Sequence, residues 1–177
     1  MEATEDALTA LPPVKEDWSF GVRLVLGYLR RSLAFHQGLT RAGFDDARAN
    51  RLVEDLGWEM FGPPSVLSYR LTRVVGHDLV RRVRAVDRLM WRTMFNKPFE
   101  RVDRPGRADL SFDVVRCPFA HYFAWAGVPR FTTHAACQLD ERLAELWGMQ
   151  LLRTGTIAEG NDLCDFGFSE IPVQITG

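Results

Sequence analysis

The sequence lacks the motifs that define the common enzyme classes. It contains no glycine-rich phosphate loop, no HExxH, no GxSxG and no CxxC, so the enzyme classes that these patterns identify find no support. Lysine is rare, since Lys15 and Lys97 are the only two, and the 22 basic and 23 acidic residues leave a formal net charge of -1. This balance provides no overall field that would attract a nucleic acid, an anionic membrane surface or a highly charged substrate.

Long apolar runs are missing as well. Arginines interrupt the apolar stretches well before the roughly 18 residues that a membrane-spanning helix needs. Residues 1–18 are acidic and have neither the basic segment nor the apolar segment of a secretion signal. We therefore expect a cytoplasmic protein with no membrane segment and no nucleic-acid partner.

Cysteine is scarce, and its three copies are far apart in the sequence. Cys117, Cys137 and Cys164 cannot all pair with one another, and in a reducing cytosol we expect them to be free thiols. The gaps between them are longer than the paired spacing of ordinary structural zinc sites. We interpret the nearby aromatic residues as core residues and not as cofactor contacts. The sequence therefore predicts neither a metal nor a cofactor.

What is present suffices for one globular domain. The chain has 177 residues, of which 46% are hydrophobic and 25% are charged, and a chain of this size buries a core without disulfides or metals. Residues 1–16 are polar and include Pro12 and Pro13, which is typical of a mobile N-terminal arm. Residues 17–177 are predicted to form a single domain.

Helical periodicity characterises the N-terminal half. Apolar residues recur every three or four positions over residues 18–42, and Gly43 ends the pattern. A second helix is predicted to begin at Asp45 or Asp46, either of which can cap it. The Gly-Pro-Pro of residues 62–64 is predicted to end this helix sharply.

A third and longer helix is predicted over residues 65–95, with Ser65 as its N-cap. Apolar residues step along one face of this helix, and arginines occupy the opposite face. An arginine face suits a polyanion site, but the helix also carries Asp78 and Asp87 and the chain is nearly neutral, so we interpret it as a solvated face. The helix also offers an association surface for a homodimer or a heterodimer.

The second half of the chain changes from helical to alternating patterns. After a loop over residues 96–109, alternation over residues 111–116 predicts a strand. Pro118 is predicted to open a short helix that ends at residue 126, because proline is well tolerated at the first helical position. A second short helix is predicted over residues 135–146.

A β-hairpin is predicted near the end of the sequence. Its strands are residues 149–157 and 163–168, and the Glu-Gly-Asn-Asp of residues 159–162 accepts the positive φ that tight turns need. The predicted fold class is therefore α+β. It consists of an N-terminal layer of three helices packed on a small antiparallel sheet with two short helices.

Cys117 and His121 are the first candidates for chemistry. Cys117 stands immediately before Pro118 and is the predicted N-cap of a helix, whose free N–H groups and dipole favour a thiolate. His121 lies one turn along the same helix, where it can act as a base or a proton donor. The alternative is a buried cysteine that only caps and packs, which is common for free cysteine.

Cys137, His134 and Asp140 form a second candidate group. The other two each lie three residues from Cys137, so on a helix all three share a face and provide a thiol, an imidazole and a carboxylate. In the alternative, Cys137 is a core residue, His134 belongs to the preceding loop and Asp140 pairs with a nearby arginine. Cys164 and Asp165 are adjacent on a predicted strand, so only one of them can face a given cavity.

Three short segments form an ordered series in the second half. They are VRCPFA at residues 115–120, CQLD at residues 137–140 and RTGTIAEGNDLCDFGF at residues 153–168. The first is a cysteine-proline pair after a strand, the second a CxxD on the next helix, and the third an R-x-x-T-x-A-x-G-x-x-x-C-D-F-x-F hairpin. Together they resemble the signature of the L-2-amino-thiazoline-4-carboxylic acid hydrolase family. The resemblance covers residues 111–168 well and the helical half only in its general layout.

The resemblance implies hydrolytic opening of a small cyclic amidine-like ring that bears a carboxylate, through an N-carbamoyl intermediate. Under this hypothesis, Cys117 or Cys137 provides a thiolate or a polar shelf for the ring. Arg116 or Arg153 binds the carboxylate in a bidentate fork. Asp140 orients the protonated amidine or acts as general base.

The remaining candidates complete this hypothesis. His121 or His134 would shuttle protons, and Cys164 and Asp165 would contact the substrate, a small amino-acid-like molecule. One alternative is a diverged relative that catalyses ring closure or displacement on an amino-acid-derived intermediate in specialised-metabolite biosynthesis. Another is a non-catalytic small-molecule-binding or partner subunit, whose sign would be thiols that are all buried and unreactive.

Overall fold

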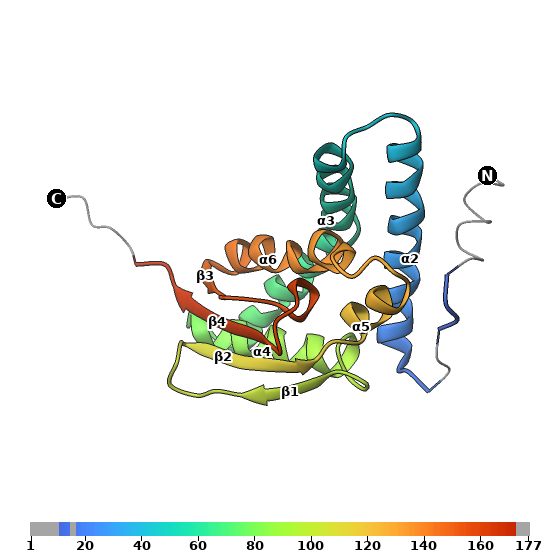
Figure 1. Cartoon of the computed structure of the whole chain (residues 1–177). Coiled ribbons are helices and arrows are strands. Elements are labelled where there is room, and N and C mark those ends of the chain that lie inside the picture. The colour runs from blue at the N-terminus through green and yellow to red at the C-terminus, as the bar shows by residue number, and fades with distance from the viewer. Residues whose placement is uncertain (1–10, 15–16, 173–177) are drawn as a thin grey trace.

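Helices and a four-stranded antiparallel sheet form two layers in the computed structural model, which describes residues 11–14 and 17–172 (Figure 1). The predicted α+β class is confirmed. Residues 1–10 and 15–16 of the predicted N-terminal arm lie outside the described residues. The rest of the arm contacts the domain, where the carbonyl oxygen of Pro12 accepts a hydrogen bond of 2.6 Å from the Tyr122 hydroxyl.

Two long helices stand side by side above the sheet layer (Figure 1). Helix α2 spans Phe20–Arg41 and helix α3 spans Asp46–Leu71. The side chains of Ser19 and Asp45 cap them by accepting hydrogen bonds from backbone N–H groups of the first turn, which satisfies donors that a helix leaves free. The sequence predicted Asp45 as one of two possible caps of α3, whereas it placed the start of α2 two residues early, at residue 18, and did not predict the Ser19 cap.

The predicted break at residues 62–64 is wrong, because α3 continues through Pro63 and Pro64. A proline inside a helix removes a backbone hydrogen bond and costs about 3 kcal/mol relative to alanine. Helix α3 nevertheless packs against α2 and against helical segments of the second half, and tertiary packing of this kind outweighs local propensity. Ser65 is not an N-cap, and its hydroxyl donates to the carbonyl oxygen of Phe61 at 2.7 Å.

The predicted third helix over residues 65–95 is also wrong in its extent. A 3₁₀ turn, Thr72–Val75, follows α3, and the chain then reverses at Gly76, whose φ of 122° is in a region that side-chain-bearing residues rarely adopt. Asp78 caps a new helix, α4, which spans Leu79–Thr93. The expected association surface is therefore divided between α3 and α4.

The sheet has the strand order β1-β2-β4-β3, and every neighbouring pair is antiparallel. Its strands are β1 at Glu100–Asp103, β2 at Leu110–Arg116, β3 at Met149–Leu152 and β4 at Cys164–Glu170. Strand β1 was not predicted, since residues 96–109 were expected to form a loop. This edge strand is short and largely exposed, so it has no alternation of apolar and polar residues that could reveal it.

The two short helices of the second half are present, and one of them is modified. Helix α5 spans Pro118–Trp125, as predicted. The predicted helix over residues 135–146 is a π-helical turn, Thr133–Cys137, followed by helix α6 at Leu139–Trp147. The backbone N–H of Gln138 donates to the carbonyl oxygen of the first residue of that turn at 3.0 Å, which is the five-residue spacing of a π-helix.

The hairpin pairs β3 with β4 as predicted, but its first strand ends before residue 157. After β3 the backbone N–H groups of Thr154 and Gly155 donate to the Asp165 carboxylate at 2.9 and 3.0 Å. A 3₁₀ turn, Ile157–Glu159, follows. The Asp165 side chain on β4 thus accepts hydrogen bonds from backbone N–H groups that would face the β4 backbone if β3 were longer.

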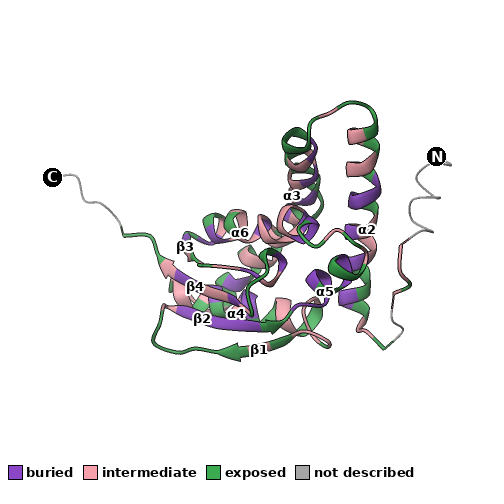
Figure 2. Ribbon diagram, in the orientation of Figure 1, coloured by how far each residue is buried: buried purple, intermediate pink, exposed green. Residues whose placement is uncertain are grey.

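Buried residues concentrate where the helices meet β2 and β4, whereas the edge strand β1 is exposed (Figure 2). Phe123, Leu26 and Leu29 are among the largest side chains that are fully buried. Within the described residues, none of the helices combines the length and the apolarity needed to cross a membrane.

Candidate active site

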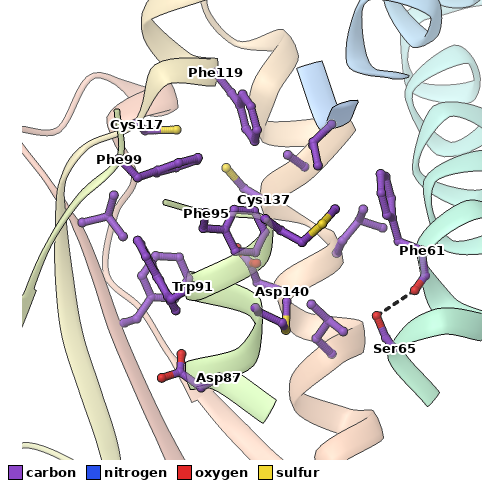
Figure 3. A pocket seen from close by; sticks show the side chains of 18 of the residues that line it. Phe61, Ser65, Asp87, Trp91, Phe95, Phe99, Cys117, Phe119, Cys137 and Asp140 are labelled. Atoms are coloured by element: carbon purple, nitrogen blue, oxygen red, sulfur yellow. Dashed lines mark hydrogen bonds between the residues drawn. The ribbon is translucent and has the colours of Figure 1, made fainter. Parts of the chain in front are cut away.

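A largely apolar cavity of about 330 Å³ lies between the layers. Its walls come from α2 to α6, from β2 and β4 and from the π-helical turn, so both halves of the chain contribute to it. Aromatic side chains form much of the surface, as Figure 3 shows for Phe61, Trp91, Phe95, Phe99 and Phe119. Enclosed apolar cavities with a few polar groups are the usual form of a small-molecule site.

Three thiols and one predicted carboxylate line this cavity. Cys117 lies just before α5, Cys137 ends the π-helical turn, Asp140 is in the first turn of α6, and Cys164 begins β4. The strand register places Cys164 opposite Val114 of β2, three residues before Cys117. The fold therefore brings together residues that the sequence spreads over three separate motifs.

Arg153 holds Asp140 in place. Its Nη1 donates to Asp140 Oδ2 at 2.6 Å and its Nη2 donates to the carbonyl oxygen of Cys137 at 3.1 Å. Arg153 does not line the cavity, and it is paired as the alternative interpretation of Asp140 expected. The Asp140 side chain stays 28% exposed, and its Oδ1 has no hydrogen-bond partner among the described residues. One carboxylate oxygen is thus available to a molecule in the cavity.

The Asp140 carboxyl is tuned by two opposing influences. Burial is the larger influence and raises the pKa, the charge and the hydrogen bond of Arg153 lower it, and the net result is a pKa of about 6 in place of the usual 3.8. Burial penalises the charged form of a carboxyl, and a nearby guanidinium favours that form. A carboxylate with a pKa near 6 is mostly ionised at neutral pH and still accepts a proton readily, which suits a general base.

Burial makes the three cysteine thiols harder to ionise. Burial raises the pKa of Cys117 to about 12, although its Sγ accepts a hydrogen bond from Ala120 N at 3.5 Å. The capping prediction is correct. Desolvation opposes the thiolate that the helix N-terminus would favour, which agrees with the alternative of a buried cysteine that caps and packs. Burial also raises the pKa of Cys137 and of Cys164. Among the described residues, no three His, Cys, Asp or Glu side chains are grouped so that they could hold a metal ion.

Three other predicted site residues lie away from the cavity. His121 is exposed on α5. Arg116 is also exposed and pairs with Glu100 at 3.1 Å. His134 Nδ1 lies 3.0 Å from a carboxylate oxygen of Glu54 on α3. The structure therefore does not group these residues with Asp140.

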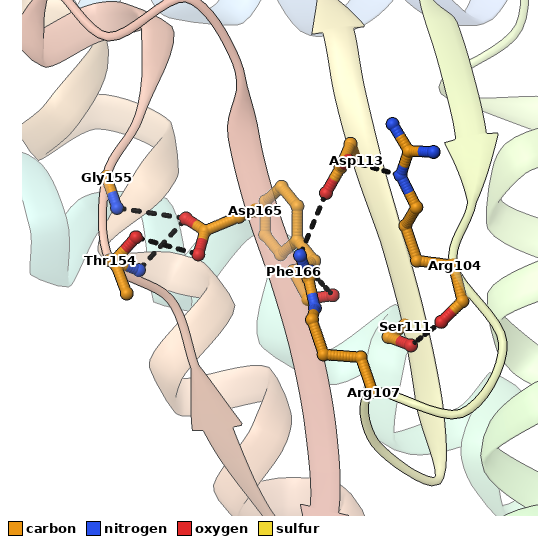
Figure 4. A network of polar contacts seen from close by, with 8 residues as sticks. All are labelled: Arg104, Arg107, Ser111, Asp113, Thr154, Gly155, Asp165 and Phe166. Atoms are coloured by element: carbon orange, nitrogen blue, oxygen red, sulfur yellow. Dashed lines mark hydrogen bonds and ion pairs between the residues drawn. The ribbon is translucent and has the colours of Figure 1, made fainter.

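Asp165 is on the face of the sheet opposite the cavity. Its neighbours in sequence, Cys164 and Phe166, line the cavity, so strand alternation directs Asp165 away from it. Asp165 instead binds the chain after β3, and the pKa of its carboxyl is lowered mainly by the hydrogen bond from Thr154, although partial burial opposes this. Directly across the strands lies Asp113, which accepts from two arginines at 2.6 and 3.1 Å (Figure 4).

Sequence reasoning missed a second carboxylate in the cavity wall. Asp87 of α4 is buried and pairs with Arg101 Nη1 at 2.9 Å. The Arg101 guanidinium also lies 3.7 Å from the ring centre of Phe112. The available signal was the position of Asp87 four residues after Val83, on the apolar side of a helix, where an unpaired carboxylate would be costly.

The comparison with known proteins supports a family assignment. A family model described as L-2-amino-thiazoline-4-carboxylic acid hydrolase matches residues 71–168, which is more than half of the chain. The matched segment contains the three cysteines, Asp140 and Arg153. Neither a curated protein nor a solved structure matches the chain.

Proposed function

The chain belongs to the L-2-amino-thiazoline-4-carboxylic acid hydrolase family, and from this membership we propose that it is an enzyme that hydrolytically opens the ring of a small cyclic amidine of the thiazoline type. The reaction takes place in the cavity beside Asp140. The observation that carries the proposal is the Asp140–Arg153 pair, in which one carboxylate oxygen is held at 2.6 Å and the other is free to act.

The proposed reaction uses water as the nucleophile. The oxygen of a water molecule forms a bond to the amidine carbon, and Asp140 Oδ1 takes a proton from that water. The ring bond between the amidine carbon and sulfur then breaks, and the sulfur takes the proton from Asp140 to become a thiol. The new hydroxyl on the carbon releases its proton to solvent and becomes the carbonyl of an N-carbamoyl product, which is heavier than the substrate by one water. Arg153 keeps Asp140 ionised between turnovers, because its positive charge favours the carboxylate form.

Cys137 has a supporting role in this proposal. Its raised pKa keeps the thiol protonated at neutral pH, so it is a weak S–H donor and a polarisable contact for the ring. Cys117 and Cys164 are buried in the same wall. A water route therefore fits the state of the thiols better than covalent attack by cysteine does.

Binding without catalysis is the second candidate function, and the thiols favour it as well. None of the three cysteines has the lowered pKa or the open surroundings of a reactive thiol. In this alternative the chain binds a small molecule, or serves as a partner subunit, and Asp140 only orients the bound amidine.

The test is to incubate the purified protein with 2-amino-thiazoline-4-carboxylate and with carboxylate-free 2-amino-thiazolines, and to follow products by mass spectrometry. We expect a product heavier by one water. Asp140→Asn should lower kcat/KM by about 10²–10⁴-fold, the usual contribution of a general base, and should leave the circular dichroism spectrum unchanged. Glu145→Gln is the matched control, because Glu145 is exposed on the same helix and does not line the cavity.

Two outcomes would count against hydrolysis. Full turnover by Asp140→Asn would remove Asp140 from the reaction. Binding of the compounds with no product from any of them would instead support the binding role.

A further inference from the structure

The wall of the cavity is built for an apolar partner. Phe61 of α3 lies across from Trp91, Phe95 and Phe99 (Figure 3). The Ser65 hydroxyl at the α3 side donates to a carbonyl of its own helix, so it adds little free hydrogen-bonding capacity. A volume of about 330 Å³ falls within the roughly 300–1,000 Å³ that holds drug-sized ligands. The cavity thus suits a molecule with a substantial apolar part.

The charged side chains in this wall are both acidic. Within the described part of the chain, Asp87 and Asp140 line the cavity and no lysine, arginine or histidine does. Each carboxylate has an arginine partner, Arg101 for Asp87 and Arg153 for Asp140. Arg101 also contacts a second carboxylate at 2.7 Å, and Arg153 also binds the carbonyl oxygen of Cys137. Both guanidinium groups are committed to protein acceptors.

A substrate carboxylate is poorly matched to such a wall. An anion that loses its hydration in an apolar cavity needs a cation or several donors in exchange. Here it would meet aromatic rings and, at the polar end, Asp140. A cationic amidinium is better matched, since it can donate an N–H bond to the free Oδ1 of Asp140 in a charge-assisted pair.

We propose that the substrate of this cavity is a cationic cyclic amidine with an apolar substituent about as large as an aromatic ring, and without the carboxylate that the family name includes. The proposal rests on the proposed function, because it places the same amidine carbon beside Asp140. The amidinium lies against Asp140 Oδ1. The apolar substituent lies among Trp91, Phe95 and Phe99, where its removal from water supplies the affinity.

The test compares two probes that share one ring. They are 2-amino-4-phenyl-2-thiazoline and 2-amino-thiazoline-4-carboxylate, titrated at pH 7.5 and followed by calorimetry and by tryptophan fluorescence, since Trp91 lines the cavity. We expect the phenyl compound to bind at least about ten-fold more tightly, because it buries more apolar surface and brings no anion. Equal or tighter binding of the carboxylate would overturn the proposal.

Measuring the hydrolysis of both compounds distinguishes failure of this proposal from failure of the proposed function. If the phenyl compound binds more tightly and neither compound is hydrolysed, the substrate class stands and hydrolysis fails. If the carboxylate is hydrolysed and binds at least as tightly as the phenyl compound, hydrolysis stands and the substrate class fails.

Two variants show whether the probe occupies the cavity. Ala136→Leu adds a bulky side chain to the cavity wall and should weaken binding of the phenyl compound by about ten-fold or more. Ala124→Leu is the matched control, because Ala124 is exposed on α5 and does not line the cavity. Equal binding by both variants would place the probe elsewhere and overturn the proposal.

Discussion

Asp140 and Arg153 are thirteen residues apart in the sequence and share one hydrogen bond of 2.6 Å. Burial of Asp140 favours the neutral acid, and Arg153 favours the carboxylate. If Asp140 is the base, activity rises with pH as the carboxyl loses its proton near pH 6 and is constant above that. In that case the Asp140–Arg153 pair sets the lower end of the pH range in which the protein is active.

Replacement of Arg153 should move that limit upward. In Arg153→Gln the influence that lowers the Asp140 pKa is lost while burial remains, so the midpoint of the kcat/KM profile should shift to higher pH. Arg153→Lys should restore part of the shift, because it keeps a positive charge. Arg142→Gln is the control, since Arg142 pairs with Asp55. A midpoint that is the same in Arg153→Gln and in the parent would show that this pair does not tune the base.

At the residue scale, the sequence predicted contacts between residues that are a few positions apart. It did not predict contacts between residues that are far apart in the chain. The Cys117 cap follows from the adjacent Pro118, and the structure has it. The ionisation of Cys117 depends on its burial in a core cluster whose members come from distant parts of the sequence, and no local pattern reports this. The same reason explains why Asp87 was read as a surface charge.

At the scale of elements, α2 approaches the C-terminal end of α4 closely at Gly21. A Cβ atom on Gly21 would lie 1.9 Å from the carbonyl oxygen of Thr93, so the two helices would have to separate. Gly27, in the same helix, has its nearest atom at 3.7 Å. Only one of these two glycines is therefore required by packing.

Alanine substitutions should separate the two positions. Gly21→Ala should destabilise the protein by about 1–3 kcal/mol, as overpacking does. Gly27→Ala should stabilise it by about 0.5–1 kcal/mol, because alanine is the better helix former. Urea unfolding measures both. A Gly21→Ala variant as stable as the parent would mean that the helices are not in close contact there.

Periodicity predicted the helical nature of α2, α3 and α4 but placed their limits wrongly where packing and turns compete. The prolines of α3 were read as a stop, although Pro63 is exposed and the helix continues past it. Gly76 and Asp78 form a stop and a cap inside a stretch that was read as one helix. The π-helical turn before α6 was invisible, because one extra residue in a helix leaves no clear mark on apolar spacing.

At the scale of the whole molecule, α+β could be inferred from the sequence and the cavity could not. The change from helical spacing to strand alternation near residue 111 is a local pattern, and it gives the class. The cavity is lined by residues as far apart in the sequence as Val25 of α2 and Phe168 of β4, so its existence depends on how the layers meet. The sequence indicated the cysteines and Asp140 as candidates, but it did not show that they line one cavity.

An open cavity lowers the free energy of unfolding, because the atoms that line it lack packing contacts on one side. Ala136→Leu should fill part of it and raise the free energy of unfolding by about 0.5–2 kcal/mol, as cavity-filling substitutions commonly do. Thermal melting beside Ala124→Leu measures the effect. A lower melting temperature in Ala136→Leu alone would indicate that the side chain does not fit and that the cavity is smaller than its walls suggest.

The cavity is lined by residues from inside and from outside the segment that the family model matches. Asp140, Arg153 and the three cysteines lie within residues 71–168, whereas Leu29 of α2 and Phe61 of α3 belong to the preceding segment and line the same space. Mutations in α2 and α3 can therefore reshape the cavity wall without replacing Asp140, Arg153 or the three cysteines. In evolutionary terms, α2 and α3 are the part of the molecule in which selection can change the shape of the cavity while the candidate residues of the matched segment are inherited unchanged.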